Sequence, residues 1–184
     1  VNSLDFEAGA RRPDPQRLLQ AYHASGSALN LVRAFTMGGF ADLRQVHAWN
    51  QDFVRDSLAG QRYELMARDI DRALAFMHAC GADPDEFQRV EFYAAHEALS
   101  MDYERALTRI DSRTGNPYDV SGHFLWVGER TRQLDGAHVH FASTISNPIG
   151  MKVGPTAAPE DIVEAARVLN PNNIPGRLSL ITRM

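Results

Sequence analysis

The sequence predicts an α/β fold with about four parallel strands, preceded by a mainly helical segment. In the second half of the 184-residue chain, short and almost continuously apolar segments alternate with stretches long enough to hold a helix each. That pattern is typical of parallel strands covered on both faces. In the first half, apolar residues recur at spacings of three and four, which indicates amphipathic helices. We therefore predict one domain, with a helical segment over 1–80 and four successive βα units over 81–184.

Three helices are predicted in the first half, over residues 15–35, 41–56 and 61–79. Asp14-Pro15 begins the first helix, because proline suits the first helical turn, and Gly38-Gly39 ends it. Two sets of apolar residues are expected to face a core. They are Leu18, Leu19, Tyr22, Leu29 and Val32 in the first helix, and Tyr63, Met66, Ile70, Leu74 and Met77 in the third.

Four strands are predicted over residues 89–96, 122–128, 148–154 and 177–184. The clearest helix between them covers 159–169. Pro159 stands at its start, acidic residues follow in the first turn, and Asn170-Pro171 ends it. Its apolar residues, Ile162, Ala165, Ala166 and Leu169, lie on one face.

The composition excludes several classes of protein. A net charge of −4 and a pI near 6.0 give no general basic field, so nucleic acid is not expected as a partner. Cys80 is the single cysteine, which excludes an internal disulfide framework and fits a reducing compartment. No apolar run reaches the roughly 20 residues that span a bilayer, and the first residues lack the apolar core of a signal peptide. We expect a cytoplasmic protein without membrane contact.

A charged residue lies at the end of each predicted strand. Glu97 follows the first, Glu129 and Arg130 the second, Lys152 lies near the end of the third, and Arg183 near the end of the fourth. Because the carboxyl ends of parallel strands meet at one edge, the three cations would stand on neighbouring strands. Each taken singly has an ordinary explanation as a solvated loop residue or ion-pair partner. Together they indicate a site for a compact polyanion, such as a phosphorylated carboxylic acid.

The segments that carry these residues resemble one family. "LWVGERTRQLDGAHVHF", "NPIGMKVGPT", "LNPNNIPGRLSLITRM" and "NLVRAFTMGGFADLRQVHAWNQDFV" are similar to class II (plant and actinobacterial type) 3-deoxy-D-arabino-heptulosonate 7-phosphate (DAHP) synthases. The likeness extends over nearly the whole chain. It implies a (β/α)8 barrel enzyme, a transferase that joins phosphoenolpyruvate to erythrose 4-phosphate in the first step of the shikimate pathway. It also implies a homo-oligomer and, as a possible partner, chorismate mutase.

The resemblance implies roles for the charged residues. Arg130, Lys152 and Arg183 would hold the phosphate and carboxylate of phosphoenolpyruvate, and Trp126 would line the pocket beneath them. Glu129 would position a backbone amide or the attacking water, or would be the structural partner of its neighbouring arginines. Both interpretations of Glu129 are open. Glu129 and Lys152 are the candidate catalytic residues.

The sequence also departs from the family pattern. The family uses manganese or cobalt, held by a cysteine near the amino terminus and by a histidine, a glutamate and an aspartate from later strands. None of these ligands matches a position in this chain, and Cys80 in "FMHACGAD" does not match the metal cysteine. We therefore expect the chain to be a fragment with about half of a barrel, its metal ligands outside it. Alone it would be inactive and prone to aggregate.

Two histidine motifs have alternative explanations. "HVH" at 138–140 would suit a metal-dependent hydrolase if it lay on a strand, but its context favours the start of a helix, where the two rings diverge by about 200 degrees. His96 and Glu97 lie at the predicted edge, where they could face the sugar phosphate or the outer shell of the metal. His96 could equally be a satisfied structural residue.

Two further functions compete with the synthase. One is a non-catalytic half-barrel that binds a partner chain or an anionic metabolite. The other is a related synthase with an amino-sugar donor or a role in secondary metabolism, which shares the same motifs. Metal ligands encoded beside this segment would favour an enzyme.

Overall fold

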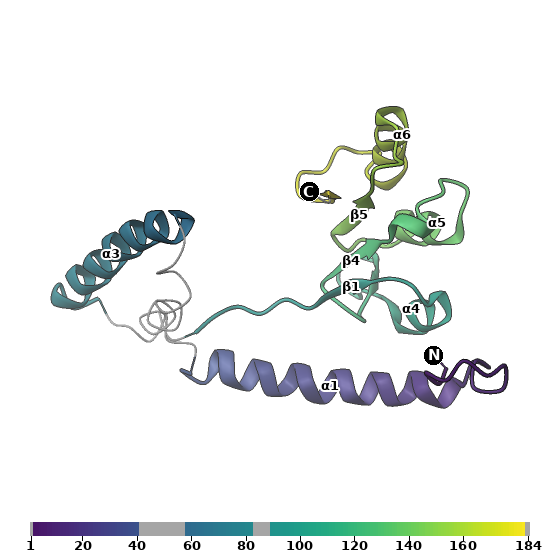
Figure 1. The fold of residues 1–184 in the computed structure, drawn as a ribbon, viewed down its shortest axis with the longest axis horizontal. Helices are drawn as coiled ribbons and strands as arrows, with labels where there is room; N and C mark the ends of the chain where they lie inside the picture. The colour runs from purple at the N-terminus through teal and green to yellow at the C-terminus, as the bar shows by residue number, and fades with distance from the viewer. Residues whose placement is uncertain (1, 41–57, 83–88, 183–184) are drawn as a thin grey trace. The chain divides into compact units, whose positions relative to one another are not determined.

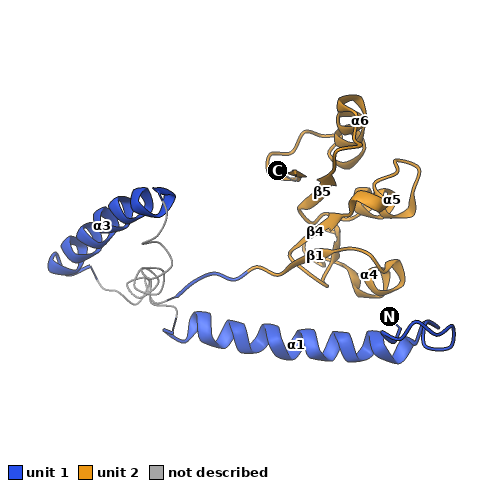
Figure 2. Ribbon diagram, viewed as in Figure 1, with its two compact units in different colours: residues 1–92 blue, residues 93–184 orange. Residues whose placement is uncertain are grey.

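The computed structural model describes residues 2–40, 58–82 and 89–182 (Figure 1). The chain forms two compact units, residues 1–92 and 93–184 (Figure 2). The predicted helix over 41–56 lies outside the described residues, and so does Arg183.

The first unit contains two long helices, α1 (Pro15–Met37) and α3 (Leu58–Ala79). Asp14 caps α1 as its position before Pro15 predicts, since its Oδ1 accepts the N–H of Gln16 at 3.0 Å. Gly38 is the residue that ends α1. Both helices therefore form where the sequence predicts them, with ends that differ by up to three residues.

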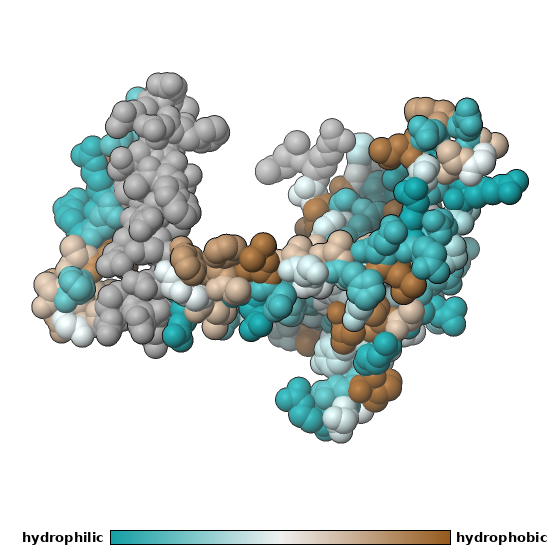
Figure 3. Space-filling view, turned by 90° about the horizontal axis from the view of Figure 1, so that it is seen from below, coloured by the Kyte–Doolittle hydropathy of each residue, from teal (hydrophilic) through white to brown (hydrophobic). Residues whose placement is uncertain are grey.

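The predicted burial of the two helical stripes is wrong for the described structure. Helix α1 has no buried residue, and in α3 only Gly60 and Ala67 are buried. The exposed fraction is 52% for Ile70 and 61% for Met66, and hydrophobic residues lie on the surface of the molecule (Figure 3). Spacing identifies the apolar face of a helix but contains no information about the partner that covers it.

The second unit confirms a mixed α/β fold with four parallel strands. The sheet order is β1-β4-β5-β6, and every pair is parallel. The strands are β1 (Ala95–Glu97), β4 (Phe124–Val127), β5 (Ile149–Val153) and β6 (Leu178–Thr182). The first strand begins later than predicted, because residues 89–94 form no strand.

The helices and the remaining strands connect this sheet. The helices are α4 (Met101–Leu107), α5 (Ala137–Thr144) and α6 (Pro159–Leu169), and a short 3₁₀ turn, η2, covers Glu129–Thr131. An antiparallel pair, β2 (Thr108–Ile110) and β3 (Pro117–Asp119), follows α4 and was not predicted. Helix α6 has the predicted bounds and ends at Asn170.

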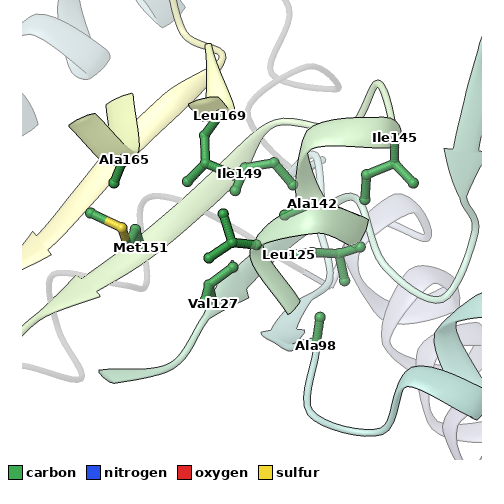
Figure 4. Packing of buried hydrophobic residues seen from close by; sticks show 10 residues of the cluster. Ala98, Leu125, Val127, Ala142, Ile145, Ile149, Met151, Ala165 and Leu169 are labelled. Atoms are coloured by element: carbon green, nitrogen blue, oxygen red, sulfur yellow. The ribbon is translucent and has the colours of Figure 1, made fainter. Parts of the chain in front are cut away.

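The core lies between one face of the sheet and helices α5 and α6 (Figure 4). Alternate strand residues point to this face: Leu125, Val127, Ile149 and Met151, each 1% exposed. They pack against Val139 and Ala142 of α5 and Ala165 and Leu169 of α6. Burying each large apolar side chain contributes about 1.5–3 kcal/mol, so this layer fixes the strands that hold the site.

None of the helices within the described ranges combines the length and the apolarity that crossing a bilayer requires.

Candidate anion-binding site at the strand ends

The face of the sheet opposite the core holds the candidate site. In register, Glu97 lies beside Trp126, and Trp126 beside Gly150. Lys152 is two residues beyond Gly150 on β5 and therefore points to the same side. Three of the predicted site residues, Glu97, Trp126 and Lys152, thus share one face near the carboxyl ends of β1, β4 and β5.

Lys152 is held between an acid and an aromatic ring. Its Nζ donates a hydrogen bond to Oε2 of Glu97 at 3.1 Å and lies 5.3 Å from the centroid of the Trp126 ring. The second distance is that of a cation–π contact. The Lys152 side chain is still 41% exposed. The ammonium group is therefore oriented by the protein and remains accessible to an anion.

Gly128 allows Glu97 to approach the backbone closely. A Cβ atom at position 128 would lie 2.8 Å from Cδ of Glu97, nearer than side chains tolerate. A side chain at position 128 would therefore displace the Glu97 carboxylate from its present place beside Lys152.

Glu129 connects the ends of β4 and β5. Its Oε2 accepts the backbone N–H of Gly154 at 2.6 Å, and its Oε1 lies 3.2 Å from Nε of Arg132. Burial acts to raise the pKa of Glu129, but the Gly154 hydrogen bond and Arg132 outweigh it and lower the pKa. Glu129 is therefore an ionised brace that positions a backbone amide. Its arginine partner is Arg132, one of the two neighbouring arginines, and not Arg130.

The convergence of three cations is only partly visible. Strands β4, β5 and β6 are neighbours, as predicted. Arg130 lies in η2 with an exposed side chain, and no ion pair of its guanidinium is present among the residues that the structure covers. Arg183 lies outside the described residues, so the meeting of Arg130, Lys152 and Arg183 stays a prediction.

His96 points to the other face of the sheet. Although it precedes Glu97, its Nε2 lies 3.1 Å from Oε1 of Glu104, a residue of α4. Ser121 and Asp119 complete this buried group, which sequence reasoning did not find. Its members are far apart in the chain and form no recognisable spacing. These contacts are those of a structural histidine and give no support to a substrate contact by His96.

The second histidine motif lies on a helix, as predicted. His138 and His140 are in α5, and Nε2 of His138 lies 3.0 Å from the carbonyl oxygen of Leu99. Among residues 2–40, 58–82 and 89–182, no group of three or more His, Cys, Asp or Glu side chains could hold a metal ion.

A parallel sheet with oriented charges at its carboxyl edge defines an α/β protein of the class that builds ligand sites at strand ends. The chain belongs to the class-II DAHP synthetase family, whose model matches residues 1–184.

Two curated relatives are similar over the whole chain. One, named phospho-2-dehydro-3-deoxyheptonate aldolase, from Streptomyces coelicolor, is 65% identical over 184 residues. The other, phospho-2-dehydro-3-deoxyheptonate aldolase AroG from Mycolicibacterium smegmatis, is 53% identical over 189 residues. Each match covers 100% of this chain and 41% of the relative. The chain therefore spans about two fifths of the length of these relatives.

Proposed function

We propose that this chain supplies the phosphoenolpyruvate-binding part of a DAHP synthase, the enzyme that opens the shikimate pathway. The observation that carries the proposal is the Lys152 ammonium, held between Glu97 and Trp126 at the carboxyl end of a parallel strand. The family match and the names of the two relatives support the same reaction.

Each site residue has a proposed task. Lys152 acts as the point charge between the carboxylate and the phosphate of phosphoenolpyruvate, while Arg130 and Arg183 contribute planar forks to the same anion. Trp126 lines the floor beneath Lys152. Glu129 holds the amide of Gly154 in place, and Glu97 orients Lys152.

The proposed reaction forms a carbon–carbon bond between C3 of phosphoenolpyruvate and the aldehyde carbon of erythrose 4-phosphate. Water then adds at C2, the bond between C2 and the bridging oxygen of the phosphate group breaks, and inorganic phosphate leaves. Fixed cations stabilise the charge that moves onto the phosphate without any reorganisation of the site. Lys152 suits this role because its partners orient it before the anion arrives.

A divalent metal, manganese or cobalt in the family resemblance, finds no set of ligands among the described residues. No step of the proposed reaction is therefore assigned to a metal held by them.

The larger assembly is also part of the proposal. The alternation of parallel strand and helix from β4 to β6 supports a place for these strands in a (β/α)8 barrel, with the charged edge at its carboxyl-terminal rim. A homo-oligomer and association with chorismate mutase rest on the family resemblance alone.

Calorimetric titration of the full-length protein with phosphoenolpyruvate tests the site. Loss of a charged hydrogen-bonding group costs about 1.5–3 kcal/mol, so Lys152→Ala should weaken binding by about 10- to 100-fold. Arg167→Ala is the matched control, because Arg167 pairs with Glu164 on the exposed face of α6. Unchanged affinity in Lys152→Ala would contradict the assigned site.

A further inference from the structure

Two carboxyl groups are buried side by side behind β1. Glu104 of α4 is 2% exposed and Asp119 at the end of β3 is 1% exposed. Ser121 bridges them, since its N–H donates to Oδ1 of Asp119 at 2.9 Å and its hydroxyl donates to Oε2 of Glu104 at 2.6 Å. His96 completes the cluster through Nε2, 3.1 Å from Oε1 of Glu104. The proposed reaction uses none of these four side chains.

The cluster is not a nucleophilic triad. Both Glu104 and the Ser121 hydroxyl contact the same ring nitrogen, Nε2 of His96, at 3.1 and 3.3 Å. In a serine triad the acid and the serine contact different nitrogens of the imidazole. Ser121 also directs its proton to Glu104 rather than to the histidine. Its hydroxyl therefore bridges groups and does not attack a substrate.

One oxygen of the cluster lacks a donor. Oδ2 of Asp119 is buried and has no hydrogen-bond partner among the described groups. An unpaired buried carboxylate oxygen is costly, and two adjacent buried carboxylates repel each other. A proton on Asp119 removes both costs, because the resulting O–H can donate to the ionised Glu104.

The titration behaviour agrees with this geometry. Burial, supported by the neighbouring Glu104, raises the pKa of Asp119 to about 6. Burial acts to raise the pKa of Glu104 too, but hydrogen bonds from His96, Ser121 and Asp119 lower it overall. The hydrogen bond to Glu104 raises the pKa of His96. The charges behind these shifts come from within the cluster: Glu104 and Asp119 act on His96. His96 acts on Glu104, and Glu104 acts on Asp119.

The cluster holds the strand that carries Glu97. Strand β1 has three residues and, within the described sheet, pairs only with β4. His96 is anchored on one face of β1, and the next residue, Glu97, contacts Lys152 from the other face. A shift of His96 would therefore move Glu97 relative to Lys152.

We propose that Glu104 and Asp119 share a single proton and that this pair, through His96, is a positioning unit that keeps Glu97 beside Lys152. The link to Lys152 rests on the proposed function, whereas the shared proton does not.

The sign of the pH effect follows from the directions of the shifts. The pKa of Asp119 is raised in the folded state. Its contribution to the stability of the fold is therefore fully present below the ordinary pKa of 3.8 and is lost as the pH rises to about 6. The contribution of His96 likewise falls as the pH rises above 6.5 through its raised value. Glu104 stabilises the fold above its ordinary pKa and fails only in more acidic solution. The protection of the β1 backbone amides against hydrogen exchange should therefore weaken as the pH rises from about 4 to about 7.

Hydrogen exchange of the full-length protein, read by mass spectrometry on peptides that cover residues 94–98, tests this inference. After correction for the intrinsic rate, exchange in the native protein should accelerate by up to about tenfold per pH unit between pH 4.5 and 6. Asp119→Asn should exchange at a rate independent of pH in this interval, because its amide donates to Glu104 at every pH. Asp102→Asn, the same change at an exposed residue in the first turn of α4, should behave as the native protein.

The outcomes separate the two proposals. The shared proton is overturned if exchange in the native protein does not accelerate with pH. It is also overturned if exchange in Asp119→Asn depends on pH as it does in the native protein, whatever the stability of that variant. The predicted exchange profiles without any affinity for phosphoenolpyruvate would leave the shared proton standing and refute the proposed function. A ratio of native to Asp119→Asn affinity that is equal at pH 5 and pH 7, although the exchange profiles hold, would overturn the link from the pair to Lys152, because the ratio cancels the ligand's own titration.

Discussion

At the scale of single residues, Gly154 and Glu129 form the most sharply testable contact. A Cβ atom at position 154 would lie 2.7 Å from Cδ of Glu129. Gly154→Ala should therefore push the carboxylate away from the backbone N–H whose hydrogen bond it accepts. We expect a stability loss of about 0.5–1.5 kcal/mol, the usual net contribution of one hydrogen bond, because the end of the flexible Glu129 side chain can move aside. Chemical denaturation measures it, with Gly9→Ala as control, because position 9 has no neighbouring atom within 4 Å and its φ is not positive. Equal stability of Gly154→Ala and the native protein would contradict the brace.

Single residues also show what sequence reasoning can and cannot find. Glu97 and Lys152 were predictable because each stands near the end of an apolar run, and parallel strands bring such ends together, whereas Trp126 was expected from the family resemblance. The group around Glu104 was not predictable, because its contacts join residues up to 25 positions apart without periodicity. Alternation along β1 also separates His96 from Glu97, although the two are adjacent in sequence.

At the scale of elements, α6 packs against the core face of the sheet. Leu169 is 1% exposed and packs into the core, whereas Val163 on the same helix is 52% exposed. Leu169→Ala should lower the free energy of unfolding by about 2–5 kcal/mol, because it leaves a cavity beneath the sheet. Val163→Ala should change it by less than about 0.5 kcal/mol. Thermal or urea unfolding compares the two, and similar losses would show that α6 does not pack as described.

Elements with strong local signals agree best with prediction. Helix α6 has the expected bounds because proline begins it and Asn-Pro ends it. The β2–β3 pair was missed since its strands have three residues each, too few for a period of two to be recognised. The apolar faces of α1 and α3 were identified, but their burial depends on partners that lie outside a local pattern.

At the scale of the whole molecule, the candidate site belongs to one unit. Glu97, Trp126, Glu129, Arg130 and Lys152 all lie in residues 93–184. The net charge of −4 means that a trianion such as phosphoenolpyruvate gains no attraction from the overall charge, so local cations must supply it. The central claim is therefore that side chains from three neighbouring strands converge on one small anion.

A crystal structure of the full-length protein with phosphoenolpyruvate bound tests that claim most directly. The account predicts Nζ of Lys152 and the guanidinium groups of Arg130 and Arg183 within about 3 Å of carboxylate or phosphate oxygens of one ligand molecule. A ligand bound elsewhere, or the three cations directed at different surfaces, would contradict it.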